Sequence, residues 1–127
     1  MLKDLDLRVP NINQRQRVPQ QAIQVLVDHI ASTFNPEKII LFGSYAYGTP
    51  MSWSDVDLLV IFDAPNPKQA QRDIYLSFED SLGVDLLVRT PQEVEQRLQM
   101  GDFFLRDIVA KGKILYERPD SGVGTES

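Results

Sequence analysis

The segment Lys38–Phe62, with the sequence KIILFGSYAYGTPMSWSDVDLLVIF, determines how this chain folds. Two short apolar runs, residues 38–42 and 56–62, enclose a stretch of small, polar and aromatic residues. Nearly continuous apolar runs are typical of strands that are buried on both faces of a sheet. Gly43 follows the first run directly and permits a sharp turn. The segment therefore predicts two core strands, the first of which ends in a tight turn.

Helices are expected on both sides of this segment. Apolar residues at helical spacing predict a helix that begins near Pro19 and stops at Asn35-Pro36. Asn66 followed by proline is typical of an N-cap and a first helical residue. The buried stripe of this second helix is expected to run to Leu82, with Gly83 closing it. Its members are Ala70, Ile74, Phe78 and Leu82.

The remaining sequence completes an α/β pattern. A third strand is predicted at 84–89, a capping box opens a helix at Thr90 that runs to about Gln99, and Asp102 caps a shorter helix. A last strand is predicted at 113–116. We expect a single α/β domain over residues 19–118, with a mixed sheet of about four strands and helices packed against it. Residues 1–18 are interpreted as an arm suited to partner docking, and 119–127 as a disordered tail.

Composition limits the classes of function. A chain of 127 residues, 43% of them hydrophobic, can bury one core. It has no apolar run of about eighteen residues and no secretory signal sequence, so we expect a cytoplasmic protein without membrane contact. The net charge of -5 argues against direct nucleic-acid binding, because phosphate neutralisation needs clustered cations. Residues 39–67 contain no lysine or arginine.

Three aspartates and a Gly-Ser pair are the candidate functional residues. Asp55 and Asp57 are two residues apart at the start of a strand, so their side chains project to the same side. Asp85 is the second residue of the third predicted strand, where a buried carboxylate is costly unless it is paired or binds a metal. If these strands are neighbours, the three carboxylates suit Mg²⁺, and Gly43-Ser44 can offer amides and a hydroxyl to a terminal phosphate. Each feature taken alone is also typical of an ordinary strand end.

The combination resembles a known family. The pattern GS-x10-D-x-D, followed by a later strand aspartate, resembles the nucleotidyltransferase superfamily related to polymerase beta. The short chain is similar to its minimal nucleotidyltransferase branch, and the likeness spans Glu37 to Arg118. One residue departs from the pattern, because family members commonly carry arginine in the turn after the Gly-Ser pair, where this chain has Tyr47.

The resemblance implies a role for each candidate residue. Gly43 and Ser44 would bind the triphosphate of ATP, which is the expected substrate. Asp55 and Asp57 would hold one or two Mg²⁺ ions. Asp85 would help to bind the catalytic ion and would take the proton from the acceptor hydroxyl.

The resemblance also implies an activity and a partner. The branch includes antitoxins whose partner is a helical HEPN-type toxin, and some of them attach AMP to a tyrosine of that toxin. The chain is therefore interpreted as an Mg²⁺-dependent enzyme that transfers AMP from ATP to a partner hydroxyl, releases pyrophosphate and forms a hetero-oligomer. Two alternatives stay open: a non-catalytic module that neutralises its partner by binding, and a transferase for small molecules similar to the aminoglycoside nucleotidyltransferases.

Overall fold

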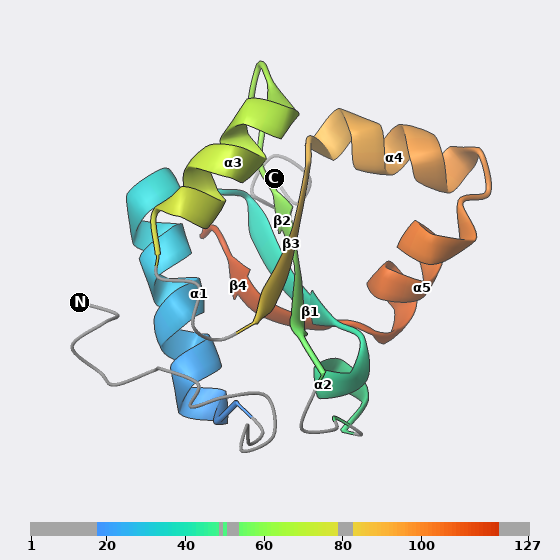
Figure 1. The fold of residues 1–127 in the computed structure, drawn as a ribbon. Coiled ribbons are helices and arrows are strands. Elements are labelled where there is room, and N and C mark those ends of the chain that lie inside the picture. Colours follow the sequence, from blue (N-terminus) through green and yellow to red (C-terminus); the bar gives the residue numbers. More distant parts are fainter. Residues whose placement is uncertain (1–17, 49, 51–53, 79–82, 120–127) are drawn as a thin grey trace.

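A four-stranded sheet lies between two layers of helices, with α1 and α3 on one face and α4 and α5 on the other (Figure 1). The computed structural model describes residues 18–48, 50, 54–78 and 83–119. In chain order the elements are α1 Gln20–Phe34, β1 Lys38–Phe42, α2 Ser44–Tyr47, β2 Val56–Ile61, α3 Pro67–Leu76, β3 Val84–Arg89, α4 Pro91–Gln99, α5 Phe103–Lys111 and β4 Lys113–Glu117. The predicted α/β fold is confirmed.

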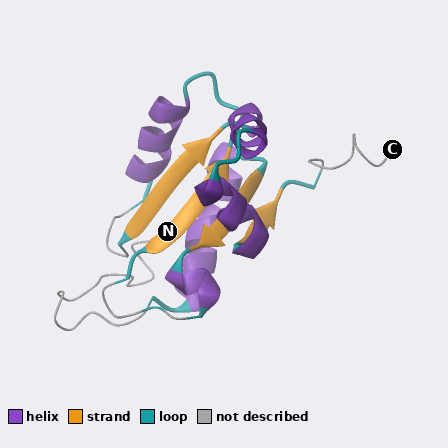
Figure 2. Ribbon diagram, turned by 90° about the vertical axis from the view of Figure 1, so that its right-hand side faces the viewer, coloured by secondary structure: helices purple, strands orange, loops and turns teal. Residues whose placement is uncertain are grey.

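The sheet is mixed, and its strand order is β3-β2-β1-β4. β1 is antiparallel to both of its neighbours, whereas β2 and β3 are parallel and are connected through α3. Figure 2 views the strands from the side of α4 and α5. β3 and β4 are the edge strands, so within the described residues the strand that carries Asp85 pairs with a strand on one side only.

The pentapeptide VDLLV occurs twice, at residues 56–60 and 84–88. The two copies pair with each other in parallel and in register. Every apolar residue therefore lies beside its counterpart in the neighbouring strand, and Asp57 lies beside Asp85. A slip of one residue would turn the Asp57 side chain toward the apolar core beneath α1 and α3, so the cost of burying this carboxylate helps to specify the register.

Each face of the sheet has its own hydrophobic core. The first is formed by α1 and α3 against one face, and the second by α4 and α5 against the other. Burial on both sides explains why the strand sequences are almost continuously apolar. Fully or almost fully buried members are Leu26, Ile30, Leu58 and Ile74 in the first core, and Leu59, Leu105 and Ile108 in the second.

The structure corrects the predicted length of α3. Asn66 caps its start as expected, since the Asn66 side chain accepts a hydrogen bond from Gln69 N. The helix ends at Leu76, however, and does not continue to Leu82. The Ser77 hydroxyl donates to Ile74 O at 2.6 Å, and Ser77 N bonds to the same carbonyl, which closes the last turn. Phe78 remains buried although it lies outside the helix, so its apolar character extended the predicted stripe.

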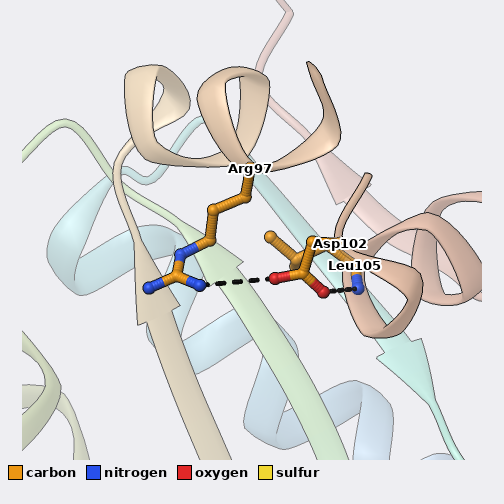
Figure 3. A network of polar contacts seen from close by, with 3 residues as sticks. All are labelled: Arg97, Asp102 and Leu105. Carbon is orange, nitrogen blue, oxygen red and sulfur yellow. Dashed lines mark hydrogen bonds and ion pairs between the residues drawn. The ribbon is translucent and has the colours of Figure 1, made fainter. Parts of the chain in front are cut away.

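Both helices of the α4–α5 layer begin at the predicted capping residues. Thr90 and Glu93 form a reciprocal capping box at the start of α4. Asp102 accepts a hydrogen bond from Leu105 N at 3.1 Å and so caps α5. The other carboxylate oxygen of Asp102 forms an ion pair with Arg97 Nη1 of α4 at 3.3 Å. Figure 3 shows both contacts of Asp102. One side chain therefore caps a helix and links it to the preceding one.

Some predicted features lie outside the described residues, namely the 1–17 part of the arm, Leu82 and the tail beyond Pro119. The last strand extends one residue further than predicted, to Glu117. Within the described ranges, none of the helices has the length and apolar character needed to span a bilayer.

The capping box gives a direct test of how α4 is stabilised. We expect Thr90→Ala to lower the free energy of unfolding by about 1 kcal/mol, because the amide of Glu93 loses its acceptor. Thr90→Ser keeps a hydroxyl at this position and should cost much less. Urea unfolding of both variants measures the difference, and equal losses would contradict a capping role.

Candidate functional site

The structure brings the three predicted aspartates to one end of the sheet. Asp57 and Asp85 are paired residues of the parallel strands β2 and β3, whose backbones lie about 4.8 Å apart. Both side chains therefore point to the same face, which is the one that α4 and α5 cover further along the strands. Asp55 lies two residues before Asp57. Asp57 is half-buried, while Asp55 and Asp85 are exposed.

Gly43 lies directly against the carboxylate of Asp57. It follows Phe42, the β1 residue that pairs with Asp57, and adopts φ 76° and ψ -159°. A Cβ atom at this position would overlap Asp57 Oδ2. Glycine is therefore required twice here, once for its backbone conformation and once for the space that the carboxylate occupies.

Burial and like charge act together on Asp57. Partial burial, followed by the charges of Asp85 and then Asp55, raises the pKa of the Asp57 carboxyl from 3.8 to about 6. Desolvation and neighbouring anions both disfavour a negative charge. A cation bound among the three carboxylates would stabilise their negative charges, so the electrostatics of the site favour cation binding.

The donor set fits a hard divalent cation such as Mg²⁺, which prefers carboxylate oxygens and shares its coordination with substrate phosphates. Asp55, Asp57 and Asp85 are the side chains that would hold it. Within the described ranges, no three His, Asp or Glu side chains are gathered closely enough to form a complete metal cage. Like charges repel one another, which agrees with this open arrangement. When bound, the metal would neutralise part of the negative charge of a triphosphate.

Ser44 is the first residue of α2 and follows Gly43 at the tip of β1. The turn packs onto the sheet through the buried Ala46, and Gly48 ends it in a left-handed conformation. Ser44 is half-buried. The backbone thus holds Ser44 one residue from the contact between Gly43 and Asp57.

Tyr47 has a partner within the protein. Its hydroxyl donates to Asp107 Oδ2 at 3.0 Å, and the other oxygen of Asp107 pairs with Lys111 Nζ at 3.2 Å. Desolvation, followed by the hydrogen bond and charge of Asp107, raises the pKa of the Tyr47 hydroxyl. The residue that replaces the usual arginine therefore links α2 to α5 and supplies no positive charge.

The surroundings of the site include residues that sequence patterns did not indicate. Phe104 of α5 packs edge-to-face on Phe42, with ring centroids 5.6 Å apart, next to the strand position of Asp57. Lys68 and Arg72 of α3 line a groove that also contains Asp85. Their i, i+4 spacing directly after the long stretch without cations is the signal that could have identified them.

One family model matches most of this chain. The model described as polymerase beta, nucleotidyltransferase, matches residues 21–121, and the chain belongs to this family. A candidate protein adenylyltransferase of Methanocaldococcus jannaschii is 42% identical over 90 residues, which are 63% of this chain and 58% of that relative. This chain thus spans less than two thirds of that relative's length. A second candidate protein adenylyltransferase of the same organism is 26% identical over 99 residues, covering 76% of this chain and 97% of the relative.

Solved structures support the fold. A candidate nucleotidyltransferase from Sulfolobus solfataricus has a TM-score of 0.53 and 23% identity, covering 76% of this chain and 78% of that one. A toxin-antitoxin crystal structure with AMP-PNP has a TM-score of 0.53 and 24% identity, covering 79% of this chain and 78% of that one. At these identities the likeness establishes a shared architecture, which agrees with the mixed sheet.

The contact between Gly43 and Asp57 can be isolated by a matched pair of variants. Gly43 and Gly48 both have a left-handed φ, but a Cβ at Gly48 would meet no atom within 4 Å. Both Gly→Ala variants should lose stability through backbone strain, and this strain is larger at Gly43, because φ 76° and ψ -159° are open essentially to glycine alone. We expect Gly43→Ala to lose clearly more, because its methyl group must displace the carboxylate.

The part of the Gly43→Ala loss that comes from the carboxylate should disappear in the Gly43→Ala/Asp57→Ala variant, so this double variant should lose less stability than the sum of the Gly43→Ala and Asp57→Ala losses. Thermal unfolding of the two glycine variants, of Asp57→Ala and of the double variant measures this coupling. Equal losses for Gly43→Ala and Gly48→Ala would show that the carboxylate does not occupy the space beside the turn.

The raised pKa of Asp57 predicts how metal-free stability depends on pH. Between about pH 4 and 6 the folded state retains a proton that the unfolded state has released, so stability falls as pH rises through this range. We expect Asp57→Asn to remove this fall and to stabilise the metal-free protein at pH 7 by about 1 kcal/mol, reduced from the full shift because the side chain is half-exposed. Asp63→Asn, at an exposed position, is the control.

Urea unfolding at several pH values, with a chelator present, measures the effect. A flat difference between Asp57→Asn and wild type from pH 4 to 7 would contradict the electrostatic coupling of the three carboxylates.

Proposed function

We propose that this protein is an Mg²⁺-dependent nucleotidyltransferase that moves AMP from ATP to a hydroxyl of a partner protein. The observation that carries the proposal is the placement of Asp57 beside both Asp85 and Gly43. Family membership supports the reaction class. Two relatives are candidate protein adenylyltransferases, which supports a protein as the acceptor.

The chemistry follows from positioning. Gly43 and Ser44 would hold the triphosphate beside the carboxylates, and Asp55 and Asp57, with help from Asp85, would hold the metal. The acceptor oxygen forms a bond to the α-phosphorus of ATP, while the bond from that phosphorus to the oxygen bridging to the β-phosphate breaks and pyrophosphate leaves. The proton of the acceptor hydroxyl passes to Asp85. In-line transfer of this kind depends on alignment and charge neutralisation and needs no covalent protein intermediate.

The position of Asp85 suits it to take the proton of the acceptor hydroxyl. It is exposed and belongs to an edge strand, whereas Asp57 belongs to an interior strand and is half-buried. An incoming hydroxyl on another molecule can therefore approach Asp85 from the open side of the sheet.

A toxin of the HEPN type is the partner that we propose. One structural neighbour is a toxin-antitoxin complex with AMP-PNP. The acidic chain, with net charge -5, complements the basic surfaces that RNA-cleaving proteins tend to present. The acceptor would be a tyrosine hydroxyl of that toxin, and the complex a hetero-oligomer.

A second candidate function is neutralisation of the partner by binding alone. The observation in its favour is Tyr47, which replaces the usual arginine and donates its hydroxyl to Asp107. A site without this cation stabilises the transferred phosphoryl group less well. The two candidates differ in whether the carboxylates are needed for suppression of the toxin.

ATP labelled at the α-phosphate tests the transfer. Wild-type protein, Mg²⁺ and the toxin encoded by the adjacent gene should yield labelled toxin. The Asp55→Asn/Asp57→Asn variant should lose at least about two orders of magnitude in rate, since it removes the charges that hold the metal. An Asp63→Asn/Asp73→Asn variant makes the same charge change elsewhere and should retain the activity.

The result also separates the two candidates. Toxin that gains no AMP, yet is still suppressed by the Asp55→Asn/Asp57→Asn variant, would establish binding alone. Labelling that survives in this variant would contradict the proposed site.

A further inference from the structure

A groove of about 590 Å³ lies between α3 and the edge strand β3, next to Asp85. One side is formed by α3 and the other by the backbone and side chains of β3. Its lining residues from α3 are Lys68, Gln71, Arg72 and Tyr75, and those from β3 are Val84, Asp85, Leu86, Leu87 and Arg89. The groove thus extends along the strand from the candidate site to the opposite end of β3.

The groove is basic although the chain is acidic. Lys68 and Arg72 are four residues apart on α3, so they lie on the same side of this helix. Both are exposed, and among the residues that the structure describes neither forms an ion pair. Arg89 adds a third cation at the far end. In a protein of net charge -5, this concentration of cations favours an anionic ligand.

The open edge of β3 is only partly closed. The carbonyls of Gly83 and Arg89 accept hydrogen bonds from backbone N–H groups on the β2 side at 2.9 Å. The backbone N–H and C=O groups of odd-numbered β3 residues therefore point toward β2, and those of even-numbered residues point outward. The outward N–H of Val88 donates to Gln71 Oε1 at 3.0 Å, and its C=O accepts from Arg89 Nη1 at 2.8 Å. For the outward groups of Leu86, no such partner is found in the part of the chain that the structure describes.

We propose that this groove binds an extended, acidic segment of the acceptor protein, which pairs with β3 at Leu86 and places its hydroxyl beside Asp85. The inference rests on the proposed function, because it names the part of the acceptor that the same site recognises. A segment added to a sheet edge gains main-chain hydrogen bonds, while its side chains select the sequence. Here the unpaired edge of β3 provides the main-chain hydrogen bonds, and Lys68 and Arg72 select acidic side chains.

The charge pattern sets the orientation of the acceptor. Asp55, Asp57 and Asp85 repel acidic side chains, whereas Lys68 and Arg72 attract them. Acidic residues of the segment should therefore lie over α3, leaving the uncharged hydroxyl residue next to Asp85. Charges arranged in this way fix the register of a bound segment more than they add to affinity.

Amide hydrogen exchange in the full-length chain tests this pairing without any need for transfer activity. The probe is a heptapeptide of sequence EQEYEQE, whose acidic residues lie on the face opposite to its tyrosine, and its control is KQKYKQK, which has the same tyrosine and opposite charge. We expect the acidic peptide to slow exchange of the Leu86 amide about tenfold at saturation, because this N–H gains an acceptor. The amides of β4, the opposite edge strand, should be unaffected, as should all amides with the basic peptide.

Charge reversal in the groove supplies the second measurement. Lys68→Glu/Arg72→Glu should weaken binding of the acidic peptide about tenfold or more, whereas Lys113→Glu, at an exposed position of β4, should leave it unchanged. Affinity for Mg²⁺-ATP should be the same in both variants. Weakened ATP binding in the double variant would show that the groove binds the nucleotide and would overturn the proposal.

The proposal is also overturned if millimolar EQEYEQE leaves the Leu86 amide unchanged, or if the double variant binds this peptide as tightly as wild type. These failures are distinct from a failure of the proposed function. Protected Leu86 without any AMP transfer would retain the docking mode and remove the catalysis. Transfer of AMP to a partner without protection of Leu86 would retain the catalysis and remove the docking mode.

Discussion

The in-register pairing of two identical VDLLV segments places Asp57 beside Asp85 in adjacent strands. Like charges in directly paired positions destabilise a sheet, so the apolar residues of the same segments must hold the register against this repulsion. They can do so because a slip of one residue would turn Asp57 toward the apolar core beneath α1 and α3. Gly43 then confines the Asp57 carboxylate from the side of β1. The fold thus keeps the charges of Asp57 and Asp85 close together, and a slip of the strands would separate them.

Much of this arrangement could be predicted from the sequence. The runs at β1, β2 and β3 are apolar on both faces, and Asn66, Thr90 and Asp102 are capping residues whose local hydrogen bonds do not depend on the rest of the fold. The end of α3 could not be predicted from periodicity, because Phe78 continues the apolar stripe by packing from outside the helix. Its end depends on the hydroxyl of Ser77.

The candidate site was predictable in its residues but not in its contacts. Spacing alone placed Asp55 and Asp57 on one side of a strand, but the position of Asp85 depended on which strand would become the neighbour of β2. The link between Tyr47 and Asp107 joins residues sixty positions apart, and no local pattern indicates it. The basic groove likewise requires α3 and β3 to lie side by side. Long-range packing therefore determined what sequence patterns could not.

The central claim is that Asp55, Asp57 and Asp85 bind a divalent cation together with ATP next to Gly43. Paramagnetic broadening by Mn²⁺ in the presence of ATP tests it most directly, since the loss of amide signals reports distance from the ion. The account predicts that trace Mn²⁺ first broadens the amides of Gly43, Ser44, Asp57 and Asp85, and that excess Mg²⁺ restores them. Broadening centred elsewhere, or unchanged in the Asp55→Asn/Asp57→Asn variant, would contradict it.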